Sequence, residues 1–308
     1  MLQNPSAVVS VVVLSYNQGQ FVEQALQSVL AQGREGVELI LADDASTDDS
    51  ISRMEAWAAQ HWPDAKRVYQ PLNAGNCRAF NAALVVASGE FVIDLAADDQ
   101  LTPERFTKQV AALQAMPAAP FCYGDARYVD AEGQVLYQHS RRFFKGGVGP
   151  EGDVFERLFR GHFICPSSVM FRTEALRALG GYNERLAFED FDIWMRMART
   201  GPVVYVPQVV SLHRVVCGSL STQFTRRQNP KLLRSVAVIG RKAGTMAVNN
   251  AERAAINWWL GYHSLLAIRA GMWFTARGVL AARVAGFGNW RLFSVTCLVR
   301  SAKWLRLF

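Results

Sequence analysis

Residues 8–19 read VVSVVVLSYNQG, a β-branched apolar run that ends in a short polar loop. The run at 8–14 has the length and composition of a buried strand. Beyond the loop, apolar side chains recur at helical spacing, at Phe21, Ala25, Leu26, Val29 and Leu30. This stretch therefore predicts a strand, a loop and a helix in that order.

The same order of elements repeats along the first hundred residues. Apolar runs at 37–42, 67–70 and 90–95 have strand character, and helical patterns run towards Trp57 and over 76–87. Nearly continuous apolar strands that alternate with helices indicate a mostly parallel sheet with helices on both faces. The sequence thus predicts an α/β, Rossmann-like fold.

Two acidic pairs follow predicted strands. Asp43 and Asp44 come directly after the second strand, and Asp98 and Asp99 come shortly after the fourth. In such sheets ligands bind outside the carboxyl ends of the strands, so both pairs should lie on one edge. Neighbouring carboxylates repel one another unless a cation or hydrogen-bond donors compensate them. A divalent metal ion that binds phosphate groups is the simplest explanation of how both acidic pairs are tolerated at this edge.

Local chemistry offers an alternative for each pair. Residues 43–50 have the composition of a turn that leads into a helix cap. Thr102 and Pro103 suit a helix cap and a first helical position, which leaves Asp98 and Asp99 free. Neither a G-x-G-x-x-G fingerprint nor a P-loop is present in the sequence.

Length and composition limit the classes of protein to which this chain can belong. The chain has 308 residues, half of them hydrophobic, which is enough to build a buried core. Its five cysteines form no C-x-x-C pair, and we expect free thiols in a reducing compartment. We also expect neither a signal peptide nor a transmembrane helix, because the apolar stretches at 7–14 and 254–268 are too short or too polar.

Charge divides the chain near residue 230. Residues 231–308 hold 12 of the 33 lysines and arginines and a single acid, Glu252, so they carry a net charge of +11. Residues 1–230 carry −4. The C-terminal part also holds five of the eight tryptophans. We therefore predict a boundary near Asn229 and Pro230.

A series of motifs runs along roughly residues 7–222. The segments are VSVVVLSYN (9–17), ELILADDASTD (38–48), NAG (73–75) with Asn81, SGEFVIDLAADD (88–99), YGD (123–125), VDAEG (129–133), GGYNE (180–184) and FEDFDIWMR (188–196). In their order and spacing these segments resemble the motifs of family 2 glycosyltransferases, which have the GT-A fold and invert the anomeric centre.

The resemblance implies a role for individual residues. It assigns Ser15 and Tyr16 to a nucleotide-base pocket and Asp44 to a hydrogen bond with the base. Asp98 falls on the second acid of the D-x-D element, which binds metal and nucleotide, and Asp99 follows it as a further metal ligand. Asp190 falls on the catalytic base.

The chain differs from the family pattern at three places. Ala96 replaces the first acid of D-x-D, and Phe80 replaces a basic residue, for which we take the nearby Arg78 as the nucleotide-binding cation. Val216 replaces a late histidine; His213 is only a weak substitute and stays outside the predicted metal site. We expect Mn²⁺ or Mg²⁺ to be held mainly by Asp98 and by diphosphate oxygens.

Asp190 also has a purely structural interpretation. Acids at the start of a helix complement its dipole, and the core face of this helix would be Ile193, Trp194 and Met197. We assign Asp192 to that role. For Asp190 the resemblance favours catalysis, since an inverting transfer needs a carboxylate to accept the proton of the acceptor hydroxyl.

Residues 231–308 predict helices over 232–247, 251–284 and 289–307, with possible breaks at Gly261, Gly271 and Gly278. Basic helices with tryptophan suggest an anionic membrane surface. The alternative is a helical bundle that packs on the catalytic domain or on a second subunit. Nucleic-acid binding is disfavoured, because the basic residues are dispersed and no recognition motif accompanies them.

Together these observations predict a catalytic domain over 1–230 and a basic, tryptophan-rich helical region over 231–308. The expected activity is metal-dependent transfer of a hexosyl or deoxyhexosyl group from a UDP- or dTDP-sugar to a hydroxyl of a glycan or lipid-linked glycan. The expected setting is polysaccharide synthesis at the cytoplasmic face of the membrane. The alternative is a catalytically decayed GT-A protein that binds glycans or serves as a scaffold, with Ala96 marking a lost metal site.

Overall fold

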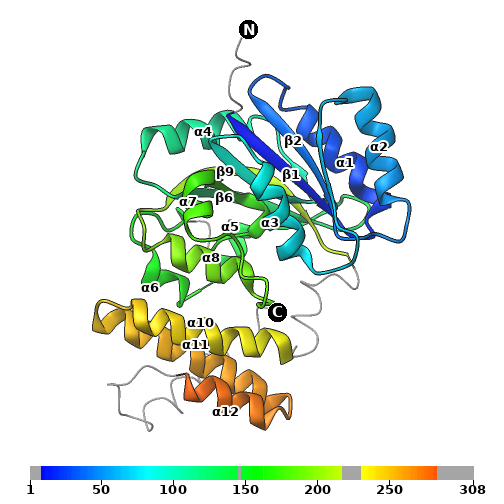
Figure 1. Cartoon of the computed structure of the whole chain (residues 1–308). Coiled ribbons are helices and arrows are strands. Elements are labelled where there is room, and N and C mark those ends of the chain that lie inside the picture. The colour runs from blue at the N-terminus through cyan, green and yellow to red at the C-terminus, as the bar shows by residue number, and fades with distance from the viewer. Residues whose placement is uncertain (1–7, 145–146, 162, 217–229, 283–308) are drawn as a thin grey trace. The chain divides into compact units, whose positions relative to one another are not determined.

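The computed structural model describes residues 8–144, 147–161, 163–216 and 230–282 (Figure 1). The chain divides into two compact units, each described here by itself. The first comprises Met1–Asp153, His162–Glu184 and Arg196–Arg214. The second comprises Val154–Gly161, Arg185–Met195 and Val215–Phe308. The units interleave along the sequence, whereas the composition predicts a single boundary near residue 230.

The first unit is built on one sheet, in which nine strands fall within the described residues. They are β1 (Val9–Ser15), β2 (Val37–Asp43), β3 (Lys66–Tyr69), β4 (Phe91–Ala96), β5 (Gln100–Leu101), β6 (Phe121–Val129), β7 (Val135–Gln138), β8 (Val169–Arg172) and β9 (Val204–Arg214). The order is β3-β2-β1-β4-β8-β6-β9-β5, with β7 paired to β6.

The pairing differs between the two halves of the sheet. Strands β3, β2, β1 and β4 are parallel, as the strand–helix repeats predict. The second half is mixed: β8 runs antiparallel to β4 and β6, β6 and β9 are parallel, and β5 and β7 add antiparallel pairs. The predicted α/β fold is thus confirmed, with a mixed rather than parallel second half.

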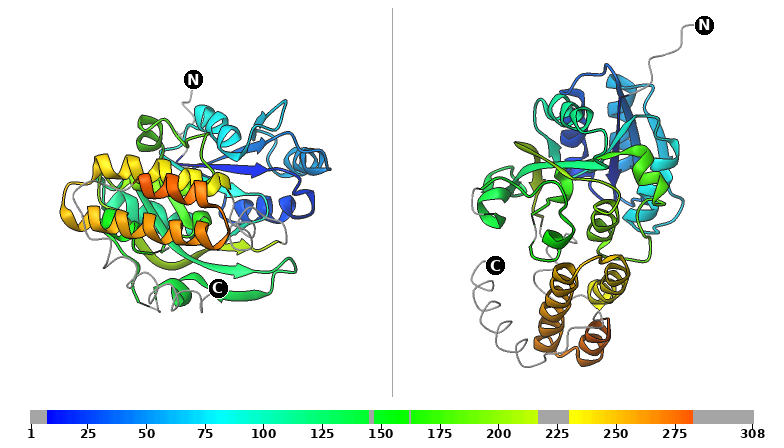
Figure 2. Two further views of the ribbon diagram at one scale, coloured as in Figure 1. Left: turned by 90° about the horizontal axis from the view of Figure 1, so that it is seen from below. Right: turned by 90° about the vertical axis from the view of Figure 1, so that its left-hand side faces the viewer.

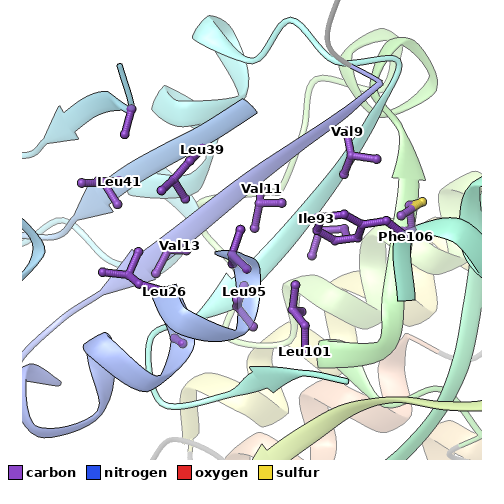
Figure 3. Packing of buried hydrophobic residues seen from close by; sticks show 14 of the residues in the cluster. Val9, Val11, Val13, Leu26, Leu39, Leu41, Ile93, Leu95, Leu101 and Phe106 are labelled. Atoms are coloured by element: carbon purple, nitrogen blue, oxygen red, sulfur yellow. The ribbon is translucent and has the colours of Figure 1, made fainter. Parts of the chain in front are cut away.

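Helices cover both faces of the parallel half. The helices of this unit are α1 (Gly19–Leu30), α2 (Ser50–His61), α3 (Asn76–Val86), α4 (Arg105–Ala115), α5 (His139–Phe143) and α7 (Thr173–Ala178), with a 3₁₀ turn at Pro166–Ser168. On one face, alternate residues of β1, β2 and β4 pack against α1 and α4 in a continuous apolar core (Figure 3). Helix α3 contacts β1 and β2, and it covers the opposite face.

The second unit is helical over its described residues. It contains α6 (Phe155–Leu158), most of α8 (Glu189–Met197), α10 (Pro230–Met246), α11 (Asn250–Arg269) and α12 (Trp273–Ala281). Helices α10, α11 and α12 contact one another and lie side by side in Figure 2. The predicted break at Gly271 is confirmed, because this residue has φ +72° and ends α11.

Other details of the predicted helices need correction. Gly261 lies inside α11 and Gly278 inside α12, so neither breaks a helix. Helix α4 begins at Arg105, and Thr102 does not cap it. The Thr102 hydroxyl instead donates to the Val209 carbonyl at 2.7 Å, because Thr102 follows the edge strand β5 beside β9. The predicted helix over 289–307 lies outside the described residues, and none of the described helices has the length and hydropathy that crossing a bilayer requires.

Candidate active site

The carboxyl ends of three adjacent strands bring the predicted residues to one edge of the sheet. Ser15, the last residue of β1, pairs in register with Asp43 of β2, and Leu14 pairs with Ala96 of β4. The segments that follow these strands therefore begin side by side. They carry Tyr16, Asp44 and the Asp98–Asp99 pair.

The carboxylates of Asp43 and Asp44 accept hydrogen bonds from residues of nearby loops. Asp43 is fully buried, and its carboxylate accepts hydrogen bonds from the Ser46 amide at 2.7 Å and the Ser46 hydroxyl at 2.5 Å. The two oxygens of Asp44 accept from the amides of Ala74 and Gly75, both at 2.8 Å. Turn chemistry thus accounts for Asp43, and Asp44 fixes the loop that leads into α3.

The loop after β1 is joined to the loop after β2. The Asn17 side-chain oxygen accepts from the Thr47 amide at 2.8 Å, and the Asn17 amide donates to the Ser46 hydroxyl at 2.8 Å. The Gly19 amide donates to Asp48 at 3.1 Å. Asn17 has φ +54°, a left-handed conformation that asparagine tolerates better than most residues. These bonds fix the backbone around Tyr16.

Two side chains at this edge have properties that suit ligand binding. The Ser15 hydroxyl is buried and has no hydrogen-bond partner in the described part of the chain. Such an unsatisfied polar atom is costly without a partner. The Tyr16 ring is 48% exposed, which leaves an aromatic face available for stacking.

Asp99 is held by residues that arrive from β9. It is 3% exposed; one oxygen lies 2.9 Å from His213 Nδ1, and the other accepts the Arg214 amide at 2.8 Å. Burial lowers the pKa of His213, but the charge and hydrogen bond of Asp99 outweigh burial and raise it to about 10. The imidazole is therefore cationic at neutral pH, and the pair is an ion pair.

Asp98 has a pKa above the ordinary value of an aspartate. Its carboxylate accepts a hydrogen bond from the Gln18 side chain. Burial, followed by the negative charge of Asp99, raises its pKa to about 6, although His213 acts in the opposite direction. A bound cation would relieve this electrostatic penalty.

Arg214 ties the acidic segment to α1 and to the turn at Ala131, and sequence reasoning did not find this role. Its guanidinium donates to the carbonyls of Asp98 at 3.0 Å and Ala131 at 2.7 Å and to the side chain of Gln24 at 2.8 Å. It also lies 4.6 Å from the centre of the Phe21 ring. Because its partners are far apart in sequence, no local pattern could have identified them.

The acidic segment offers a metal few protein ligands. No group of three or more His, Cys, Asp or Glu side chains suited to a metal ion occurs among the residues that the structure describes. Both oxygens of Asp99 already accept hydrogen bonds, so Asp98 has the better available carboxylate. The donor set therefore fits a cation held by Asp98 and by a ligand's own oxygens.

Three further predicted residues lie on helices α3 and α8. Arg78 is exposed on the first turn of α3. Asp190 is half-buried in the first turn of α8 and belongs to the second unit. Trp194 is 5% exposed, which confirms its assignment to the core.

Within the second unit, α10 and α11 hold the start of α8. The Ala187 amide donates to the Ser235 hydroxyl at 2.8 Å, and Asp192 accepts from Lys242 Nζ at 2.8 Å. The Phe191 ring stacks on Trp259 at 4.9 Å and 11°. Asp192 is fully buried, so it has an ion-pairing role beyond the predicted complement to the helix dipole.

Two named relatives each match about two thirds of the chain. The putative glycosyltransferase EpsE of Bacillus subtilis is 27% identical over 202 residues, which cover 64% of this chain and 69% of the relative. The putative colanic acid biosynthesis glycosyl transferase WcaA of Escherichia coli is 28% identical over 198 residues, which cover 64% of this chain and 67% of the relative.

Solved structures share the fold. TarS of Staphylococcus aureus, in complex with UDP-GlcNAc, has a TM-score of 0.70 at 17% identity and covers 90% of this chain and 81% of its own. The mannosyltransferase PcManGT of Pyrobaculum calidifontis, in complex with GDP-Man and Mn²⁺, has a TM-score of 0.65 at 22% identity and covers 100% and 85%. These likenesses establish the GT-A architecture.

The profile of the family described as Glycosyl transferase family 2 matches residues 10–180, which is more than half of the chain. The matched region contains β2, β4, all of β1 except Val9, and the edge that carries Ser15, Tyr16 and both acidic pairs. The protein is therefore an enzyme of glycosyl transferase family 2, with a GT-A fold.

Proposed function

We propose that the enzyme transfers a sugar, with inversion, from a UDP- or dTDP-sugar to a hydroxyl of a glycan or a lipid-linked glycan in polysaccharide synthesis. The relative WcaA is named for colanic acid biosynthesis, which supports the polysaccharide setting. Solved neighbours hold UDP, UDP-GlcNAc or GDP-Man, so they support a nucleotide-sugar donor without choosing the base.

One observation carries the donor assignment. At the carboxyl edge of the parallel strands, the unsatisfied Ser15 hydroxyl lies next in sequence to the exposed Tyr16 ring. A nucleotide would give the hydroxyl a hydrogen-bond partner and the ring a stacking partner. We place the base there, beside the loop that Asp44 fixes, and we assign the exposed cation of Arg78 to the donor.

We assign the metal to Asp98, with Asp99 as its neighbour. Asp98 fits because burial and Asp99 raise its pKa, a penalty that a cation removes. The ion, Mn²⁺ or Mg²⁺, would neutralise negative charge on the leaving diphosphate. The His213–Asp99 pair and Arg214 would then keep the Asp98 backbone in position.

Asp190 is our candidate for the general base that accepts the proton of the acceptor hydroxyl. Its position at the start of α8, a segment anchored by Ser235 and Lys242, supports a fixed orientation. Replacement by asparagine should abolish transfer and leave donor affinity within a few-fold. Glu189→Gln, at the neighbouring acid, is the matched control. Equal losses of donor affinity and turnover in Asp190→Asn would show that Asp190 is not the general base.

We place the enzyme at the cytoplasmic face of the membrane, where a lipid-linked acceptor would be reached. The basic region after residue 230 supports membrane attachment. Contact with a second subunit is the alternative for this region.

Calorimetric titration with UDP, dTDP and GDP, each with Mn²⁺, with Mg²⁺ or with EDTA, tests the proposal. We expect metal-dependent binding of UDP or dTDP that is lost in Asp98→Ala, with Glu104→Ala as the exposed control. Absence of binding under every condition would favour the scaffold function, for which Ala96 in place of an acid is the supporting observation.

A further inference from the structure

The turn between α11 and α12 presents two large aromatic side chains to solvent. The exposed fractions of Trp273 and Phe274 are 66% and 93%. Both lie in the first turn of α12; the buried side chains of this segment are Ala276, Val279 and the C-cap residue Ala282. At 100° per residue, the face formed by these three alanine and valine residues is centred about 120° from Trp273 and about 140° from Phe274. The exposed aromatic pair is therefore not needed to pack α12 onto its neighbours.

A defined helix ending holds this pair in place. The Met272 amide donates to the Ala267 carbonyl at 2.9 Å, and the Gly271 amide donates to the Ile268 carbonyl at 2.9 Å. With Gly271 at φ +72°, these bonds form a Schellman motif. The aromatic side chains therefore stand on a fixed turn, at the tip of the α11–α12 hairpin.

The charge around the tip is of one sign. Arg269 lies in the last turn of α11 and Arg277 lies one turn beyond Trp273, and both are exposed. Residues 230–282 contain seven lysines and arginines but one acid, Glu252. Glu252 is 2% exposed and accepts the Val248 amide, so it does not offset the surface charge. The tip combines exposed aromatic rings with cations.

From this combination we infer that the tip, defined as Arg269, Trp273, Phe274 and Arg277, is a docking surface for an anionic lipid bilayer. Aromatic side chains partition into the headgroup region, and arginines bind lipid phosphates. This inference names the residues that would contact the membrane. The biological purpose of the contact, access to a lipid-linked acceptor, rests on the proposed function.

Vesicle co-sedimentation of the full chain tests the surface without donor or acceptor. We expect binding to vesicles of phosphatidylcholine mixed with phosphatidylglycerol, and little binding to phosphatidylcholine alone. Replacing both aromatic residues, Trp273→Ser with Phe274→Ser, should lower the partition coefficient at least about tenfold. Each of Arg269→Gln and Arg277→Gln should lower it about fivefold, the factor that corresponds to about 1 kcal/mol per cation near the surface.

Controls keep the result specific. Val248→Ser removes an exposed apolar side chain of the same unit, 75% exposed, and should leave vesicle binding unchanged. The aromatic variant should keep the parent's melting temperature and nucleotide affinity. Nucleotide binding tests the transferase assignment and vesicle binding tests the docking surface, so a failure of one is distinguishable from a failure of the other.

Two results would overturn the inference. Unchanged vesicle binding by the aromatic variant would show that the tip is not the contact. A parent protein that is dimeric by analytical ultracentrifugation, does not bind the vesicles, and becomes monomeric in the aromatic variant would identify the tip as a contact between two copies of the chain.

Discussion

His213 Nδ1 lies 2.9 Å from an oxygen of Asp99, although the two residues are 114 positions apart in sequence. The Asp99 side chain is 3% exposed and that of His213 19%. The pair joins the end of β9 to the segment after β4, and so to the candidate metal ligand Asp98. Together with the contacts of Arg214, it links parts of the first unit that are far apart in sequence.

Removing the cation of this pair should destabilise the fold. His213→Ala leaves a buried carboxylate without its cationic partner, and we expect the free energy of unfolding near neutral pH to fall by about 3 kcal/mol. Urea unfolding of the parent and the variant measures this change. In a double-mutant cycle with Asp99→Asn, the coupling should exceed about 1 kcal/mol. Additive effects of the two substitutions would show that the pair contributes nothing.

The loop before α3 should depend on both oxygens of Asp44. Asp44→Asn turns one acceptor into a donor that faces the amide of Ala74 or Gly75. We expect a loss of about 1–3 kcal/mol and faster amide hydrogen exchange over residues 72–76. Asp49→Asn, which removes an exposed partner of Arg53, should change stability by less than about 1 kcal/mol. Unchanged exchange at Ala74 and Gly75 would contradict this role of Asp44.

Lys242 should be required for the stability of the second unit and for the placement of α8. Lys242→Met removes the ammonium group that pairs with the fully buried Asp192, which should cost about 3 kcal/mol. If α8 carries the catalytic base, turnover should fall while donor affinity stays within a few-fold, and Lys242→Arg should restore part of it.

Arg241→Met provides the matched control for Lys242. This neighbouring cation is exposed, and its replacement should change stability by no more than about 0.5 kcal/mol. A Lys242→Met protein with the stability and turnover of the Arg241→Met protein would exclude the proposed placement of α8.

Glu38 should make stability depend on acid pH. Burial raises its pKa, but hydrogen bonds from Lys66, Ser10 and Ser88 outweigh burial and lower it below 4.5. The folded protein therefore binds this proton less tightly than the unfolded chain. The stabilisation is complete above the ordinary pKa and is lost as the pH falls through the folded-state pKa.

Unfolding free energies of Glu38→Gln against pH measure this contribution. The parent should exceed the variant at neutral pH, and the difference should shrink below about pH 4.5. Glu35→Gln, at an exposed position three residues earlier, should follow the parent throughout. A difference between parent and Glu38→Gln that is independent of pH would contradict the assignment to Glu38.

The sequence alone determined the parallel half of the sheet and the edge at which the predicted residues gather. Apolar periodicity around residues 8–42 and 90–95 is local information, and parallel strands necessarily end on the same side. It also determined the family, since the motifs occur in order along the chain.

Only the tertiary structure decided the partners of those residues. Asp43 bonds within its own turn, but Asp44 bonds across to the loop before α3, and no pattern in the ADDAS segment separates the two. The pairing of Asp99 with His213 and of Asp192 with Lys242 depends on which elements cross in space. Burial sets the cost of each charge, and burial is a property of the packed chain. Secondary structure follows from neighbours in sequence, whereas the electrostatics of the site follow from neighbours in space.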